Sequence, residues 1–177
     1  MIQIGEWITY ILEADNLKVK VKDVGNGVIL LSFQFGTNET DLMPTNVGFG
    51  YTYILPIVLS GLIAKPGEII IIENPEAHLH PKAQSRLIEF LALVGETGIQ
   101  LIIESHSEHI LNAIRIQIAA PNVSLGPEDV SVLYFYLNSE NDQKVTPITI
   151  DTDGSIETWP ENFFDQSRKD LKVLLGM

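Results

Sequence analysis

Four consecutive isoleucines, Ile69 to Ile72, constrain the fold of this chain more than any other feature of its sequence. An unbroken apolar run of this length predicts a strand buried on both faces, which is typical of a parallel sheet covered by helices. A helical pattern over 81–94, a second apolar run over 99–103 and another helical pattern over 108–120 follow. We therefore expect strand, helix, strand, helix, with the two strands parallel and joined by a right-handed crossover.

Composition and charge exclude several classes of protein. The length of 177 residues suits one domain or one lobe of a larger protein, and the formal net charge of −12 leaves no broad basic surface for nucleic acid or anionic lipid. Any nucleic-acid contact is therefore expected only in the full-length protein. The absence of cysteine excludes disulfides, cysteine-zinc sites and thiol nucleophiles, and favours the cytoplasm. The longest apolar stretch, 51–64, is shorter than the about 20 residues of a membrane span, so no membrane is expected as a partner.

Weaker patterns divide the chain into three parts. A lead-in over 1–45 contains a helical turn and two strands, 18–21 and 28–35, joined by Gly25-Asn26-Gly27, which is a hairpin-turn signal. The central part, 46–129, holds a helix over 51–64 that includes Pro56, then the parallel strands, and ends in a polar break over 121–129. The last part, 130–177, predicts two antiparallel strands, 130–137 and 145–150, and a final helix over 159–175 with Pro160 in its first turn.

Polar residues gather where the two apolar strands end. Glu73 follows the isoleucines and Glu104-Ser105-His106 follows the second run. The carboxyl ends of parallel strands meet at one edge of the sheet, where open sheets bind ligands. Glu73 and Glu76 offer the hard oxygen atoms that Mg²⁺ prefers, although carboxylates here can also cap a helix or remain in solvent. His106 can hydrogen-bond a phosphate or orient water, or serve a structural role.

Two further groups are candidates for ligand binding. Asn46, Gly48 and Gly50 precede a helix, and backbone N–H groups at a helix start suit a phosphate, although glycines there also serve ordinary loops. His78 and His80 are spaced to hold zinc with Glu73 or Glu76 as a third ligand, which would make the chain a metal hydrolase. A structural loop is the alternative for both histidines.

In order, the residues Ile69-Ile70-Ile71-Ile72-Glu73-Asn74-Pro75-Glu76-Ala77-His78-Leu79-His80-Pro81 and Ile102-Ile103-Glu104-Ser105-His106-Ser107 form a recognisable set. This set resembles the C-terminal half of an ATPase head of the ATP-binding-cassette type, as in the chromosome-maintenance, recombination-repair and overcoming-lysogenization-defect families. The resemblance covers about residues 45–120. It implies an α/β fold, a P-loop-NTPase-like lobe with parallel strands and flanking helices, followed by a small α+β extension. It also implies that the complete protein uses Mg²⁺ and ATP.

The resemblance implies a role for each site residue. Glu73 falls at the Walker B acid that directs Mg²⁺, and His106 at the switch histidine. Asn74 lies where many relatives carry the catalytic glutamate. An amide cannot accept a proton from water, which argues against hydrolysis, although Glu76 lies near enough in sequence to be a substitute base. The segment with Asn46, Gly48 and Gly50 resembles the signature segment, which reaches the γ-phosphate bound by the other head of a dimer, and 77–80 matches the loop that crosses the dimer interface.

One expected part is missing from the sequence. No Gly-x-x-x-x-Gly-Lys-Ser/Thr motif occurs, and the resemblance assigns this phosphate-binding loop to an N-terminal lobe. We expect that lobe to be a partner of this chain, and we expect the isolated chain to be inactive. We also expect the open sheet to promote self-association, or the protein to form a homodimer around nucleotide. Residues 130–177 resemble a C-terminal domain of unknown function found in bacterial AAA-type proteins. The alternative function is a non-catalytic interaction module that docks through these C-terminal strands and the Phe163-Phe164 helix.

Overall fold

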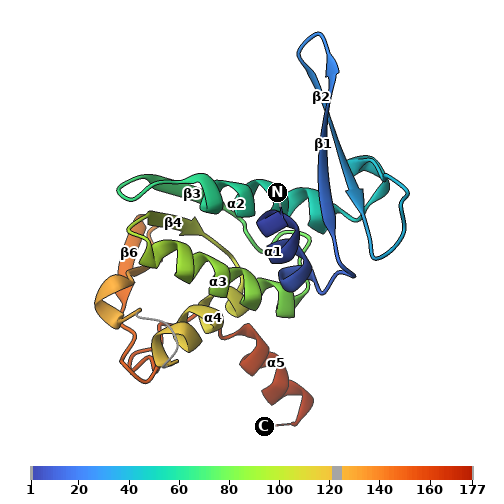
Figure 1. Cartoon of the computed structure of the whole chain (residues 1–177). Coiled ribbons are helices and arrows are strands. Elements are labelled where there is room, and N and C mark those ends of the chain that lie inside the picture. Colours follow the sequence, from blue (N-terminus) through green and yellow to red (C-terminus); the bar gives the residue numbers. More distant parts are fainter. Residues whose placement is uncertain (1, 121–124, 177) are drawn as a thin grey trace. The chain divides into compact units, whose positions relative to one another are not determined.

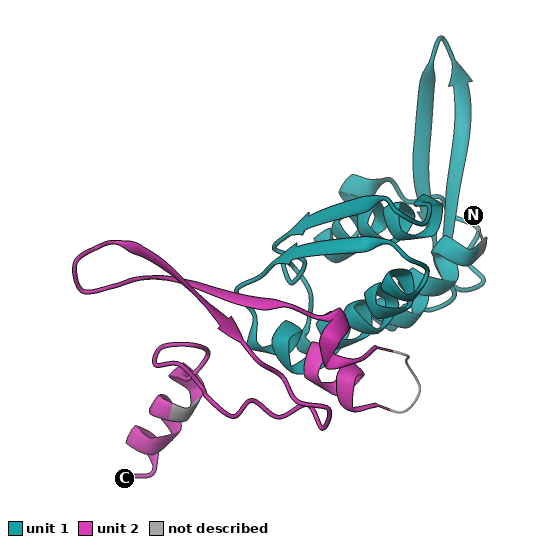
Figure 2. Cartoon of the chain, turned by 90° about the vertical axis from the view of Figure 1, so that its left-hand side faces the viewer, with its two compact units in different colours: residues 1–113 teal, residues 114–177 magenta. Residues whose placement is uncertain are grey.

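The computed structural model describes residues 2–120 and 125–176, so part of the expected polar break, 121–124, lies outside the described residues. The chain divides into two compact units, residues 1–113 and 114–177 (Figure 2). The first carries the candidate site, and α4 (Glu108–Ala119) crosses the boundary between them.

The first unit begins with a helix and a hairpin that projects from the rest of the unit (Figure 1). α1 (Ile2–Leu12) is followed by β1 (Lys18–Gly25) and β2 (Val28–Gln34), which pair antiparallel. Gly25, Asn26 and Gly27 have φ angles of 88°, 53° and 74°, the left-handed conformation that a tight hairpin turn requires. The sequence-based prediction of this hairpin is confirmed.

The helix α2 (Phe49–Ile63) forms as predicted and includes Pro56. Its Ile54 and Val58 are fully buried. Gly61 permits a close approach to α3 (Pro81–Glu96), because a Cβ atom at this position would lie 2.8 Å from Cζ of Phe90 and 2.9 Å from Cγ2 of Val94. The amphipathic face of α3 supplies much of the core of this unit, through Leu87, Ile88, Phe90, Leu91 and Val94.

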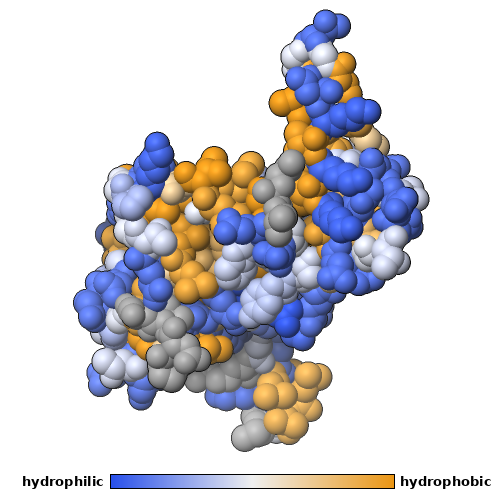
Figure 3. Space-filling model, viewed as in Figure 1, coloured by the Kyte–Doolittle hydropathy of each residue, from blue (hydrophilic) through white to orange (hydrophobic). Residues whose placement is uncertain are grey.

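β3 (Ile69–Glu73) and β4 (Gln100–Glu104) pair in parallel, with α3 as the connection. This confirms the strand, helix, strand, helix order. The expectation of burial on both faces is wrong: Ile72 is 6% exposed, but Ile69, Ile71 and Ile102 are 57%, 68% and 47% exposed. The reason is that the sheet has only these two strands among the described residues, and apolar surface remains open over β3 and α2 (Figure 3).

The second unit contains β5 (Val132–Leu137) and β6 (Gln143–Ile148), which pair antiparallel as predicted, and α5 (Gln166–Leu174). The prediction that the last helix begins at 159 is wrong. Asn162 and Phe164 have φ angles of 64° and 48°, which a right-handed helix excludes. The buried ring of Phe163 packs against the rings of Tyr134 and Trp159 at centroid distances of 4.9 and 5.5 Å, so aromatic packing displaces the expected helical turns.

Within residues 2–120 and 125–176, no helix has the length and apolar character needed to cross a membrane. A short 3₁₀ turn precedes each of two elements, η1 (Pro44–Asn46) before α2 and η2 (Pro127–Asp129) before β5.

Candidate functional site

The carboxyl ends of β3 and β4 lie side by side, as the sequence predicted. Glu73 is opposite Glu104 in the parallel register. The N–H group of Asn74 continues the ladder by donating to the carbonyl oxygen of Glu104 at 2.9 Å. Asn74 has a φ angle of 49°, so the chain turns away from the sheet immediately after Glu73. Both glutamate side chains are exposed at this edge, where carboxylate oxygens are available to a hydrated cation.

His106 lies at the same edge and pairs with a carboxylate. Its Nε2 atom is 3.0 Å from Oε1 of Glu104, and its side chain is 82% exposed. The second carboxylate oxygen of Glu104, Oε2, lies 3.3 Å from the N–H group of Asn74. The sequence predicted the place of Glu104 in the fold, but its contact with His106 emerges only from the structure. Its position opposite Glu73, at the end of the neighbouring strand, was the signal that could have identified it.

Glu76 connects the turn after β3 to the segment after β4. Its Oε2 atom accepts a hydrogen bond from Oγ of Ser105 at 2.8 Å, and its Oε1 atom accepts one from the backbone N–H of His106 at 2.7 Å. Both carboxylate oxygens therefore have donors, and a carboxylate bound in this way is held firmly. Ser105 is a second residue whose role the sequence did not reveal.

The start of α2 packs against the turn 74–80. The hydroxyl of Tyr53 lies 2.7 Å from the carbonyl oxygen of Asn74 and 3.0 Å from that of Glu73, and donates its proton to this pair. His78 stacks on Phe49 with ring centroids 5.3 Å apart, and a Cβ atom on Gly50 would lie 3.3 Å from the carbonyl oxygen of His78. The predicted phosphate-binding segment is therefore adjacent to the carboxylate edge.

The charges at this edge affect Tyr53. Burial raises the pKa of its hydroxyl, and the negative charges of Glu76, Glu104 and Glu73 raise it further. Tyr53 therefore remains protonated and able to donate over the physiological pH range. The direction of this shift is what a cluster of carboxylates produces, and a bound cation would reduce the repulsion within the cluster.

The backbone around Gly48 suits an anion. Gly48 is the N-cap of α2, and no side chain caps this helix start. The first N–H groups of a helix lack internal partners, and together with the helix dipole they attract negative charge. Asn46 is exposed at the end of η1, and its Oδ1 atom accepts a hydrogen bond from Oγ1 of Thr45 at 3.3 Å.

The zinc site that the sequence left open as an alternative does not assemble. His80 caps α3, with Nδ1 at 3.4 Å from the backbone nitrogen of Lys82, while His78 stacks on Phe49 and Glu76 bonds to Ser105. In the part of the chain that the structure describes, no three histidine, aspartate or glutamate side chains gather to hold a metal ion. Mg²⁺ places a smaller demand on the protein, because it keeps several waters and takes one or two carboxylates, and the oxygen donors at this edge fit that chemistry.

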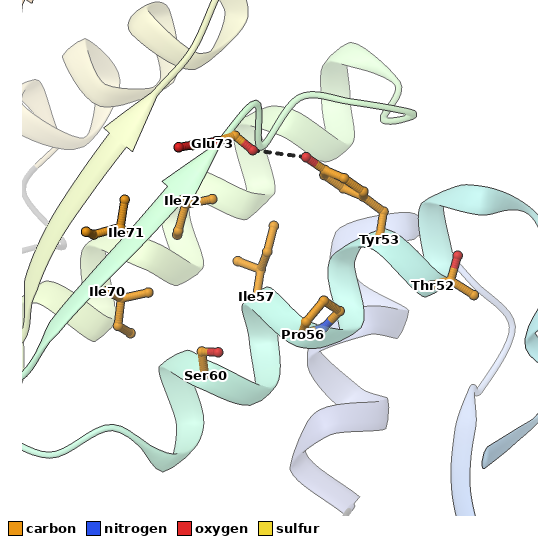
Figure 4. A pocket seen from close by; sticks show the side chains of 9 residues that line it. All are labelled: Thr52, Tyr53, Pro56, Ile57, Ser60, Ile70, Ile71, Ile72 and Glu73. Atoms are coloured by element: carbon orange, nitrogen blue, oxygen red, sulfur yellow. Dashed lines mark hydrogen bonds between the residues drawn. The ribbon is translucent and has the colours of Figure 1, made fainter. Parts of the chain in front are cut away.

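A groove of about 330 Å³ runs between α2 and β3 (Figure 4). β4 occupies one edge of β3, and the other edge faces this groove. Glu73 lies at one end, where its carbonyl oxygen meets Tyr53. The lining is mostly apolar and consists of Thr52, Tyr53, Pro56, Ile57, Ser60, Ile70, Ile71, Ile72 and Glu73.

Comparison with known proteins defines the class. Residues 5–111, more than half of the chain, match the family model of the AAA ATPase domain. The chain therefore belongs to the AAA ATPase domain family. Residues 125–174 match a second model, which describes a protein family of unknown function, DUF3696.

Particular relatives agree with this assignment. A stretch of 49 residues is 41% identical to the Old nuclease of Escherichia phage P2. This stretch covers 28% of this chain and only 8% of that protein. An SMC ATPase, from work on ATP-driven dimerization and DNA-stimulated activation, superposes with a TM-score of 0.59 over 98% of this chain and 89% of that one, at 8% identity. The SMC head bound to the C-winged helix domain of ScpA gives 0.60, with 83% and 41% covered at 8% identity.

A third structure, the Smc head with an extended coiled coil from Pyrococcus furiosus, bound to the C-terminal domain of ScpA, gives a TM-score of 0.59. It is 8% identical, and the superposition covers 98% of this chain and 37% of that chain. At such low identity these likenesses establish the fold alone. The fold is that of SMC ATPase heads, which confirms the expected α/β, P-loop-NTPase-like class.

Proposed function

We propose that this chain is the C-terminal lobe of an ABC/SMC-like ATPase and contributes part of a composite Mg-ATP site. The observation that carries the proposal is the parallel pairing of β3 and β4, which brings Glu73, Glu104 and His106 to one edge of the sheet. The start of α2, with Gly48 and Gly50, lies beside the turn that follows this edge. An acid, an imidazole and an uncapped helix start are the parts that a nucleotide site needs.

Each residue has a distinct role in this proposal. Glu73 would hold Mg²⁺ through its carboxylate. The bound Mg²⁺ would neutralise negative charge on the phosphates. His106 donates a hydrogen bond toward the γ-phosphate. Gly48 and Gly50 present backbone N–H groups to the nucleotide held by the second head of a homodimer, and Asn46 presents its exposed side-chain amide, because its own N–H donates to the carbonyl oxygen of Met43. Asn74 carries an amide where a general base is expected, and this reduces the rate at which water can be activated.

The role of substitute base passes to Glu76 only if its present hydrogen bonds are exchanged. Its two oxygens accept hydrogen bonds from Ser105 and from the His106 N–H group. Neither oxygen is therefore turned toward a water molecule in this arrangement. Nucleotide binding would have to move the segment 104–107 before Glu76 could take a proton.

The phosphate-binding loop must come from another lobe. No such motif exists in this sequence, and phosphoryl transfer depends on positioning and charge neutralisation by that loop and its lysine. We propose that the chain alone does not hydrolyse ATP. The exposed Ile69, Ile71 and Ile102 and the open edge of β3 support docking of the missing lobe against this sheet.

The wider partners follow from the same class. The SMC ATPase in the comparison dimerizes with ATP and is activated by DNA, and SMC heads bind ScpA. We propose a nucleotide-dependent homodimer for the complete protein, with nucleic acid contacted only by that assembly because this chain has a net charge of −12. The absence of cysteine supports a cytoplasmic location.

Mg-ATP binding and phosphate release test the proposal. The chain is measured alone and again after addition of a P-loop-bearing N-terminal lobe from the same family, as a separate chain. We expect silence alone and turnover after addition, with turnover lost in Glu73→Gln and His106→Ala. Glu140→Gln, on the exposed turn between β5 and β6, is the matched control and should keep full activity. Turnover by the isolated chain would overturn the proposal.

The second candidate function is a non-catalytic interaction module. It is favoured by the apolar side chains that the β5–β6 hairpin exposes, among them Phe135 at 71% and Leu137 at 62%. Binding of the added lobe without any turnover, even with saturating Mg-ATP, would support this candidate against the ATPase.

A further inference from the structure

A buried glutamine joins the two segments of the candidate site. Gln84 lies in the first turns of α3, on its buried face, and is 7% exposed. Its Nε2 atom donates to the carbonyl oxygen of Leu79 at 3.0 Å, and its Oε1 atom accepts from Oγ of Ser107 at 2.5 Å. A buried amide without partners would be costly, so these two contacts decide the orientation of this side chain.

Ser107 carries the connection to the start of α4. Its Oγ atom accepts a hydrogen bond from the N–H of His109 at 3.2 Å, which is the arrangement of a helix N-cap. Its own N–H donates to Oγ of Ser105 at 3.1 Å. One hydroxyl therefore links Gln84 to the helix that follows the switch histidine.

Ser105 and Glu76 close the circuit. Oγ of Ser105 donates to Glu76, and the N–H of Leu79 donates to the carbonyl oxygen of Glu76 at 3.0 Å. The hydrogen bonds thus run from Leu79 through Gln84, Ser107 and Ser105 to Glu76, and return along the turn to Leu79. We call the five residues of this circuit, Glu76, Leu79, Gln84, Ser105 and Ser107, the polar clamp.

We propose that Gln84 and Glu76 are positioning residues of the ATPase site, which hold the His106 segment at a set distance from the turn 74–80. This inference rests on the proposed function. The imidazole of His106 is 82% exposed and contacts Glu104, whereas its backbone N–H is bound by Glu76. The main-chain position of His106 is therefore decided by the clamp, and its side chain only by a solvent-exposed partner.

The clamp gives the turn 74–80 a means of acting on His106. If a second head presses on this turn, Leu79 and Glu76 move together, because the hydrogen bond between their backbones joins them. Gln84 and Ser105 then carry the displacement to the segment 104–107. Leu79 and Gln84 are buried and the other three residues of the clamp are half-buried. A hydrogen-bonded circuit of this kind has few alternative arrangements, so movement of one member shifts the others.

Amide hydrogen exchange of the isolated chain tests the clamp without nucleotide. Gln84→Met retains side-chain size and removes both hydrogen bonds, and we expect the amides of Ser107 and His109 to exchange about tenfold faster. Gln117→Met replaces another buried glutamine, on α4, and should leave the exchange of these amides relative to the rest of the first unit unchanged. Equal exchange rates at Ser107 and His109 in the wild type and in Gln84→Met would overturn the inference. A thermal denaturation scan of each variant shows whether it has folded.

Steady-state hydrolysis by the chain assembled with a P-loop-bearing lobe tests the role in catalysis. Gln84→Met should lower kcat at least tenfold with KM for ATP within twofold of wild type, since the clamp positions His106 without contacting nucleotide. A wild-type kcat in Gln84→Met would overturn the positioning role while leaving the proposed function intact. Absence of hydrolysis in the wild-type assembly would overturn the proposed function and this role with it, and the exchange experiment would then report a structural link alone.

Discussion

At the scale of single residues, one hydroxyl shows how the site is built. Tyr53 on α2 donates to the carbonyl oxygens that follow β3, 20 and 21 residues further along the chain. Its raised pKa keeps the proton in place, because burial and three nearby carboxylates disfavour the phenolate. The side chain thus holds the turn after Glu73 against the helix α2, which begins at Phe49.

Tyr53→Phe should lower the free energy of unfolding by about 1 kcal/mol, because it leaves two carbonyl oxygens without this donor. Chemical denaturation monitored by circular dichroism measures the change. Tyr136→Phe, an exposed position in the β5–β6 hairpin, is the control and should change the free energy by less than about 0.5 kcal/mol. A loss no larger than that of the control would contradict the role given to the Tyr53 hydroxyl.

Asp165 offers a test by pH. Its hydrogen bond with Lys169 is the main reason that the pKa of this carboxyl lies below the ordinary value of 3.8, and the N–H of Asn162 contributes as well. Because the pKa is lowered in the folded state, this carboxylate contributes its full stabilisation when the pH is above the ordinary pKa. The stabilisation is lost as the pH falls through the folded pKa. Amide chemical shifts of Asn162 and Lys169 should therefore change in acid, below about pH 4.

Asp165→Asn removes the titrating group while keeping a side chain of the same size. The acid-induced shift changes at Asn162 and Lys169 should disappear in this variant. Changes that persist would show that another carboxylate controls the segment before α5.

At the scale of elements, the approach of α2 to α3 depends on one missing side chain. Gly61→Ala should lower the free energy of unfolding by about 1–3 kcal/mol, because the new Cβ would lie 2.8 Å from the ring of Phe90. Thermal or chemical denaturation measures it.

Gly95→Ala is the matched control, since it lies in α3 and its Cβ would be 4.0 Å from the nearest side-chain atom, on Leu101. That variant should be neutral, or more stable by up to about 1 kcal/mol, because alanine has the better helix propensity. Equal effects of the two changes would contradict the close-packing argument.

The sequence predicted most elements because their signals are local. Gly25-Asn26-Gly27 demands positive φ angles, and the apolar spacing of α3 has the helical period. The last helix was the exception. The sequence pattern predicts Trp159 and Phe163 as helical positions, but the ring of Phe163 packs against Tyr134, which lies 29 residues earlier in the chain. No local pattern reveals that contact.

At the scale of the whole molecule, the open sheet is the feature most prone to self-association. Ile69, Ile71 and Ile102 form an apolar face, and the free edge of β3 borders an apolar groove. Such edges pair with other strands unless something covers them.

We therefore predict that the isolated chain self-associates, and that Ile71→Lys reduces this association because burying an ammonium group is unfavourable. Light scattering over a concentration series measures it. Val24→Lys, near the hairpin turn between β1 and β2, is the control and should not change the association. A monomer at high concentration would contradict the prediction for the wild-type chain.

The sequence by itself determined the order of strands and helices, the two hairpins, and the placement of Glu73 and His106 at one edge. Hydrophobic periodicity and turn signals are local, and a helical crossover between two consecutive strands makes them parallel. Only the tertiary structure decided that Glu76 binds the His106 segment, 30 residues away, that Gln84 closes the polar clamp, and that one face of β3 stays open. Those features depend on side-chain contacts between segments far apart in sequence, and no local pattern encodes such contacts.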